Sequence, residues 1–251
     1  ESFPGGGPYE SGGMQQGLHG EACLVPWQFR VVEDTEQQIC VLMWCETIRF
    51  PAKLEKTIML KSGRADIYFD EELINLSEEK LEYMWGHHPV FGKPFLSENC
   101  KIDIDADEFT TAQGFGSPTT YFEEGYTAKW PSGVAKAGQS VDLSLMPKKG
   151  EKNAELIFIN GLKEGALKIT NTDLNLSFSL KWDKELFKCI WYWRVCNGLP
   201  GYPWYGRTYN IGLEFWTGYP NYAGAQENGT VKTLEPSGRV RTRFEVNIAG
   251  N

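Results

Sequence analysis

Hydrophobic and polar residues alternate along short segments of this chain, and Gly, Pro, Asn or Asp separates one segment from the next. An alternation with a period of two places the apolar side chains on one face of a β-strand. Several of these segments are also rich in β-branched and aromatic residues, which favour strands. The pattern predicts strands at residues 28–33, 38–49, 52–60, 64–70, 73–76, 155–160, 166–170, 174–181, 189–195, 209–217, 230–234 and 239–248.

The segments between these strands read mostly as turns. Lys61-Ser62-Gly63 predicts a hairpin turn with glycine in it, and residues 107–150 predict a long excursion over a cleft. Residues 77–83 and 184–187 are the helical candidates, and both are too short to stand alone. Many short strands divided by turn signals favour an all-β sandwich or barrel, and 251 residues suit a single domain of this class.

Charge and composition limit the kinds of molecule that this protein is expected to bind. A net charge of −8 argues against a nucleic acid or an anionic membrane as the main partner, because both require a basic surface. The six cysteines follow no disulfide or metal-site spacing, so we expect mostly buried thiols in a cytoplasmic protein. The 9 Trp, 11 Tyr and 14 Phe could fill a core or stack on sugars. The start at Glu1 predicts a truncated N-terminus.

The histidines carry the clearest chemical signal. Only three occur, and they lie in two glycine-flanked motifs, which are Gly17-Leu18-His19-Gly20 and Trp85-Gly86-His87-His88-Pro89-Val90-Phe91-Gly92. Imidazole gives and takes a proton near neutrality. A carboxylate partner is offered by Glu214, which alternation places on one strand face together with Trp216. We therefore predict His88 and Glu214 as an acid/base pair.

Structural roles remain open for each of these residues. His19 could be a turn residue and His87 a structural one, Glu214 could pair with Arg207, and the Trp side chains could be core. The acidic alternation at Asp103, Asp105, Asp107 and Glu108 is better explained by a solvated strand face than by Ca²⁺. We predict neither a metal nor a nucleotide site.

One reaction needs only such a pair and no cofactor, namely the interconversion of the α and β anomers of a free sugar. A base removes the C1 hydroxyl proton while an acid protonates the ring oxygen, so that the ring opens and closes again. The predicted partner is accordingly a small sugar, an aldohexose or a derivative.

The order of the motifs resembles the aldose 1-epimerase family, the galactose mutarotase-like proteins. The matching features are Gly-Leu-His-Gly, then His-Pro-x-Phe, then Gly-x-Glu before an aromatic residue and Thr. The resemblance implies a large antiparallel β-supersandwich. It also implies that His88 is the general acid, that Glu214 is the base and that His19 contacts substrate. Further expected substrate contacts are Trp85, Phe91, Arg207 and Trp216.

The chain departs from the family pattern beside His88. His87 stands where the family has Asn, and Val90-Phe91-Gly92 stands where Tyr-Phe-Asn is frequent. These departures leave the sugar open and predict a divergent branch. They also motivate one alternative, a carbohydrate-binding or sensor protein without turnover. A third reading is an accessory domain of a glycoside-processing enzyme, and the near-full coverage of the family pattern by this one chain speaks against it. The oligomeric state stays open.

Overall fold

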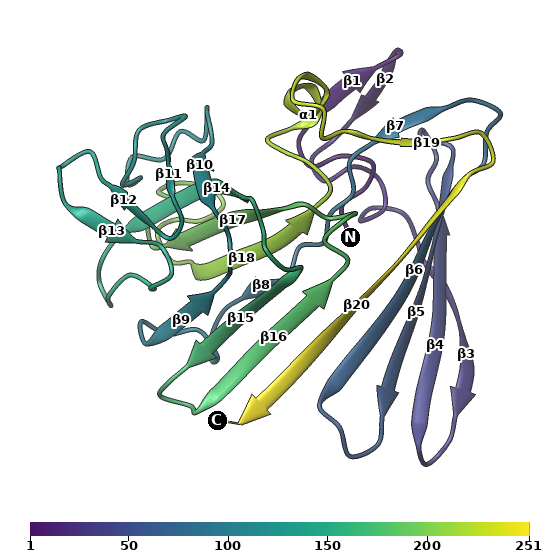
Figure 1. The fold of residues 1–251 in the computed structure, drawn as a ribbon, viewed down its shortest axis with the longest axis horizontal. Helices are drawn as coiled ribbons and strands as arrows, with labels where there is room; N and C mark the ends of the chain where they lie inside the picture. Colours follow the sequence, from purple (N-terminus) through teal and green to yellow (C-terminus); the bar gives the residue numbers. More distant parts are fainter. Residues whose placement is uncertain (251) are drawn as a thin grey trace. The chain divides into compact units, whose positions relative to one another are not determined.

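The computed structural model describes residues 1–250, and it confirms the all-β prediction (Figure 1). The chain forms two compact units built from interleaved segments. The first unit comprises Glu1–His87, Ser179–Phe187 and Trp216–Ala249, and the second consists mainly of His88–Phe178 and Lys188–Phe215. The prediction of a single domain stays a prediction.

An antiparallel meander dominates the first unit. Its strands lie side by side in the order β3-β4-β5-β6-β20, with β16 next to β20 (Figure 1). The bounds are β3 (Gln28–Asp34), β4 (Gln38–Glu46), β5 (Ala52–Lys61), β6 (Asp66–Asn75), β20 (Arg239–Gly250) and β16 (Leu176–Trp182). Strand β16 crosses the division between the units at Ser179.

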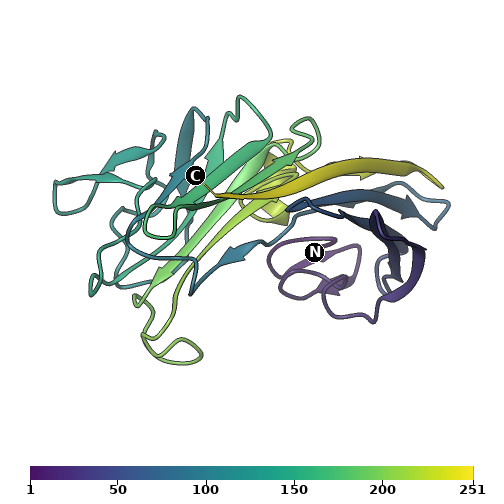
Figure 2. The same cartoon turned by 90° about the horizontal axis from the view of Figure 1, so that it is seen from below.

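The first unit also holds small elements. Figure 2 shows its N-terminal segment, coloured purple, on one side of the meander. There β1 (Tyr9–Ser11) pairs with β2 (Met14–Gln16), and β7 (Leu81–Tyr83) pairs with β19 (Lys232–Leu234). The short helix α1 (Tyr222–Glu227) begins after Asn221, whose side chain accepts a hydrogen bond from the Gly224 amide.

A six-stranded antiparallel sheet dominates the second unit, in the order β11-β10-β14-β17-β18-β8. Its strands are β11 (Thr127–Lys129), β10 (Glu108–Thr111), β14 (Asn153–Asn160), β17 (Cys189–Cys196), β18 (Tyr209–Trp216) and β8 (Val90–Phe91). In the same unit, β15 (Ala166–Asn171) pairs with β9 (Cys100–Asp103), and β12 (Ser132–Val134) pairs with β13 (Ser140–Asp142). The predicted excursion at residues 107–150 thus contains four short strands.

Both helical candidates were wrong. Part of residues 77–83 forms β7, because the Asn75 side chain holds the preceding turn through the Ser77 amide and the Glu79 carbonyl. Residues 184–187 make a single turn, closed by the Phe187 amide on the Asp183 carbonyl. Within residues 1–250, no helix combines the length and the apolar character needed to cross a bilayer.

Candidate functional site

His88 and Glu214 meet in the second unit. His88 Nε2 lies 3.2 Å from Glu214 Oε1, although 125 residues separate the two in sequence (positions 88 and 214). The Glu214 side chain is only 3% exposed, whereas the His88 side chain is 25% exposed. A buried carboxylate therefore contacts an imidazole that solutes can reach.

Pairing between β8 and β18 brings the two residues together. Gly212 lies opposite Val90, Ile211 lies opposite Phe91, and the Leu213 amide donates to the Pro89 carbonyl. His88 therefore stands just before a strand whose register on β18 is fixed. Proline at 89 also biases the backbone of His88 toward an extended conformation.

Glycine at 212 leaves space for the carboxylate. A Cβ atom built on Gly212 would lie 2.9 Å from Glu214 Oε1, which is closer than Cβ atoms normally approach. Gly212 and Glu214 are two positions apart on one strand, so their side chains point to the same face. The absence of a side chain at 212 thus allows the observed position of the Glu214 carboxylate.

An indole ring completes the immediate surroundings of His88. The Trp193 ring, on β17, stands edge-on to the imidazole with centroids 6.1 Å apart and an interplanar angle of 69°. Trp193 is half-buried and contacts the ring of Trp204 at 5.2 Å. Because His88 touches both Glu214 and Trp193, the carboxylate and the indole share one face of the sheet.

His87 has different partners from its neighbour. In the first unit, His87 Nε2 lies 2.8 Å from Glu71 Oε2, and Lys56 Nζ lies 2.8 Å from the other Glu71 oxygen. Lys56 also forms an ion pair with Glu1, whose carboxylate accepts a hydrogen bond from Trp85 Nε1. We call Glu1, Lys56, Glu71 and His87 the ion-pair cluster.

Charge balance in the ion-pair cluster favours a structural role. Burial raises the pKa of the Glu1 carboxyl, but the charges of Lys56 and His87 outweigh it and hold that pKa well below its usual range. Burial likewise lowers the pKa of Lys56, and the two carboxylates raise it above its usual value. The ligand atoms of Glu1, Glu71 and His87 lie within 4.8 Å of one another, so they could hold a metal ion. The Lys56 ammonium already supplies positive charge to both carboxylates.

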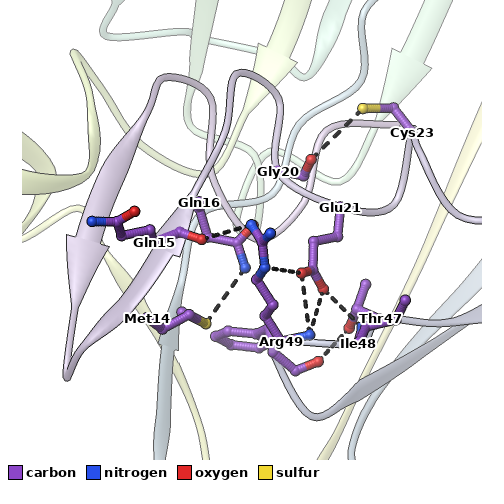
Figure 3. Close-up of polar contacts among 10 residues, drawn as sticks. Met14, Gln15, Gln16, Gly20, Glu21, Cys23, Thr47, Ile48 and Arg49 are labelled. Carbon is purple, nitrogen blue, oxygen red and sulfur yellow. Dashed lines mark hydrogen bonds and ion pairs between the residues drawn. The ribbon is translucent and has the colours of Figure 1, made fainter.

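His19 lies in a glycine turn of the first unit. Its backbone has a positive φ of 63°, and Nδ1 lies 3.4 Å from Ser2 Oγ. Burial is the largest cause that lowers the pKa of the imidazole. The adjacent Glu21 carboxylate accepts hydrogen bonds from the Ile48 and Arg49 amides, which ties the turn to the segment after β4 (Figure 3).

The two tryptophans expected to contact substrate are buried in the first unit. Trp85 is 1% exposed and Trp216 is 0% exposed, so neither ring presents a free face to a ligand in this structure. Gly86 packs directly on Trp216, where a Cβ atom would come within 2.1 Å of the indole. The core role, left open by the sequence, is what the structure shows for both rings.

Phe91 and Arg207 belong to the second unit. Phe91 is buried and packs edge-on against Phe178 at 4.9 Å. Arg207 is exposed, stacks over the Tyr205 ring at 5.6 Å and lines a pocket of about 600 Å³ together with Tyr209. The structure thus brings together His88 and Glu214 among the predicted residues, while it gives Phe91 a packing role.

Sequence reasoning missed Trp193 and Gly212. A signal existed for Trp193, because the predicted strand at 189–195 carries two tryptophans on one face, and Trp193 is the more exposed of them. The sequence alone contains no signal for the role of Gly212, because that role depends on where the Glu214 carboxylate lies.

Comparison with known proteins assigns this chain to a family. Residues 4–248 match the model of a family described as a domain of unknown function, DUF4432. The chain belongs to the DUF4432 family. None of the curated proteins compared with this DUF4432 protein matches it.

Solved structures similar to this DUF4432 protein show its fold. An Escherichia coli K12 protein, provisionally named as an aldose 1-epimerase, is 15% identical with a TM-score of 0.69, over 100% of this chain and 83% of that chain. A galactose mutarotase-like protein from Clostridium acetobutylicum is 17% identical with a TM-score of 0.66, over 98% of this chain and 76% of that one. Another from Lactobacillus casei is 15% identical with a TM-score of 0.64, over 99% and 84%. The fold is galactose mutarotase-like, as predicted.

Proposed function

We propose that this protein interconverts the α and β anomers of a free sugar, with His88 and Glu214 as the acid and the base. The observation that carries the proposal is the contact of 3.2 Å between His88 Nε2 and Glu214 Oε1. The C1 hydroxyl and the ring oxygen of a pyranose are attached to the same carbon. An acid and a base must therefore lie side by side to serve both, as these two do.

The proton transfers balance without a cofactor. The Glu214 carboxylate accepts the proton of the C1 hydroxyl while the His88 imidazolium donates a proton to the ring oxygen. The C1–ring oxygen bond breaks, and C1 becomes an aldehyde. After rotation about C1–C2, the ring oxygen attacks the other face of C1. His88 then takes its proton back from that oxygen, and Glu214 returns its proton to O1, so both groups regain their starting states.

Burial and a ring surface support the same assignment. The carboxylate is nearly enclosed, which strengthens its interaction with a charged partner and keeps it away from bulk water. The half-buried Trp193 ring beside His88 offers an apolar surface for the C–H face of a pyranose. The substrate class is therefore a sugar with a free anomeric centre, an aldohexose or a derivative of one.

Polarimetry of freshly dissolved α-glucose and α-galactose tests the proposal. We expect Glu214→Gln and His88→Ala each to lower the enzymatic rate by at least about 10²-fold, the contribution typical of general acid/base groups. Glu155→Gln is a matched control, because Glu155 is another buried carboxylate on a strand of the same sheet, at 1% exposure. Its rate should stay close to that of the wild type.

Two outcomes would contradict the acid/base assignment. Wild-type turnover in both Glu214→Gln and His88→Ala would remove these residues from the chemistry. Sugar binding by calorimetry, without any acceleration by the wild-type protein, would instead favour the carbohydrate-binding or sensor alternative. Circular dichroism spectra of every variant establish that the fold is retained.

A further inference from the structure

The aromatic surface beside His88 continues beyond Trp193. The ring of Trp204 is tilted by 54° against that of Trp193, with centroids 5.2 Å apart. Trp193 itself stands 6.1 Å from the His88 ring. We call His88, Trp193 and Trp204 of the second unit, in which Trp193 contacts each of the other two rings, the row. Both indoles are only half-buried, so the row is accessible.

Trp204 is presented by a loop that its own backbone stabilises. Residues 197–208 connect β17 to β18, and the loop is closed by the Asn197 amide on the Thr208 carbonyl at 2.7 Å. The Gly206 amide donates to the Leu199 carbonyl at 2.8 Å, and the Arg207 amide donates to the Trp204 carbonyl at 3.0 Å. A loop held in this way fixes the position of Trp204.

The loop exposes two further aromatic side chains to solvent. Tyr202 is 85% exposed and Tyr205 is 58% exposed. Tyr205 also has a positive φ of 50°, a conformation that is uncommon for an aromatic residue. Backbone strain at an aromatic residue of an ordered loop is a feature found at ligand-binding sites.

We propose that Trp204 forms a second sugar-stacking position, so that the site takes the reducing end of a disaccharide or longer glycan. This inference rests on the proposed function, because it assumes that C1 and the ring oxygen lie at Glu214 and His88. A further sugar linked through the C4 hydroxyl then leaves from the side of the ring opposite C1. The proposal places the terminal sugar on Trp193, beside His88, and the second sugar on Trp204, which contacts Trp193.

The chemistry of the two indoles fits such a ligand. Each pyranose presents an apolar C–H face that packs on an aromatic ring, while its hydroxyls remain in water. Two neighbouring indoles therefore suit two consecutive sugars. The linkage of a reducing disaccharide leaves the anomeric centre of its terminal sugar free, so the reaction at C1 proceeds as for the monosaccharide.

The test compares glucose with maltose and cellobiose, whose reducing ends are both glucose. Polarimetry gives kcat/KM for each sugar, and the informative quantity is the ratio of disaccharide to glucose. We expect Trp204→Ala to lower this ratio at least about fivefold, mainly through KM for the disaccharide, as for a contact residue that matters to binding. Trp204→Phe should retain part of the ratio.

Tyr202→Ala is the matched control, because it removes an exposed aromatic side chain from the same loop. The Tyr202 ring contacts Tyr205 at 6.4 Å and is not part of the row. Its disaccharide-to-glucose ratio should equal that of the wild type. An unchanged ratio in Trp204→Ala overturns the inference, as does an equal fall in Tyr202→Ala.

The results separate this inference from the proposed function. Acceleration of glucose but of neither disaccharide overturns the second stacking position and leaves the acid/base assignment standing. If no sugar is accelerated, the proposed function fails, and calorimetry with glucose, maltotriose and cellotriose decides the inference by itself. Tighter binding of a trisaccharide than of glucose, lost in Trp204→Ala, would support the stacking position. Equal affinities would overturn it.

Discussion

The position of the Glu214 carboxylate can be tested by adding one methyl group at Gly212. In Gly212→Ala, the new Cβ atom would lie 2.9 Å from Glu214 Oε1, whereas ordinary van der Waals contact begins at 3.4 Å. The carboxylate must therefore move by about half an ångström. A misplacement of about 1 Å can lower a catalysed rate by about 10²-fold, so this shift corresponds to about tenfold on a logarithmic scale.

The same substitution, Gly212→Ala, should lower the rate without lowering the stability of the protein. Gly212 does not have a positive φ, so an alanine fits its backbone without strain. Replacing glycine inside a strand removes conformational freedom from the unfolded chain, which stabilises a protein by about 0.5–1 kcal/mol. The shift of a carboxylate end offsets part of this gain. We expect an unfolding free energy within about 1 kcal/mol of the wild type, together with a tenfold lower kcat by polarimetry.

The neighbouring glycine provides the control. A Cβ atom at Gly92, just after β8, would meet nothing within 4 Å, so Gly92→Ala should keep the wild-type rate. A wild-type kcat in Gly212→Ala, with Glu214→Gln inactive, would refute the claim that the glycine sets the carboxylate position. The claim would also be refuted if urea unfolding showed that Gly212→Ala is partly unfolded under the assay conditions, to an extent that accounts for its lower rate.

Two further predictions concern the first unit. Lys56→Met leaves Glu71 buried without its ammonium partner and should lower the unfolding free energy in urea by about 3 kcal/mol. The control Lys53→Met removes a more exposed ion pair and should lower that free energy by less than about 1 kcal/mol. Equal losses in the two variants would contradict the reasoning. Burial lowers the pKa of His19, so the unfolded chain takes up this proton first and stability should fall as the pH drops below about 6.5. An NMR titration that places His19 at or above that value would be inconsistent with this expectation, and His19→Gln should flatten the pH dependence.

The alternation of apolar and polar residues predicted most strands, but it did not predict that some charged side chains are buried. The predicted segments 64–70 and 73–76 lie in one strand, β6, which runs through the acidic residues between them, and Glu71 of that run is 2% exposed. Lys56 lies opposite Glu71 on β5 and supplies the compensating charge. A hydrophobicity pattern within one segment cannot contain this information, since the partner comes from another strand.

The site was predictable in its residue types and not in its geometry. Nothing in the spacing of His88 and Glu214 indicates that they touch. Their residue types suggested an acid/base pair, and the family resemblance supported the same pairing. The alternation of side chains along one strand correctly places Glu214 and Trp216 on the same face. It could not show that Gly86, from a distant segment, covers Trp216 and removes its ring from any ligand surface.

The interleaving of the two units has a consequence for recombination between related genes. The first unit contains both Glu1 and Ala249, so any single crossover between two family members produces a first unit of mixed parentage. A double exchange of residues 88–215 transfers His88 and Glu214 together, but it also carries Ser179–Phe187 of the first unit into the recipient. Point substitutions in a loop such as 197–208 leave each unit of single parentage, whereas the exchange of whole segments mixes the first unit.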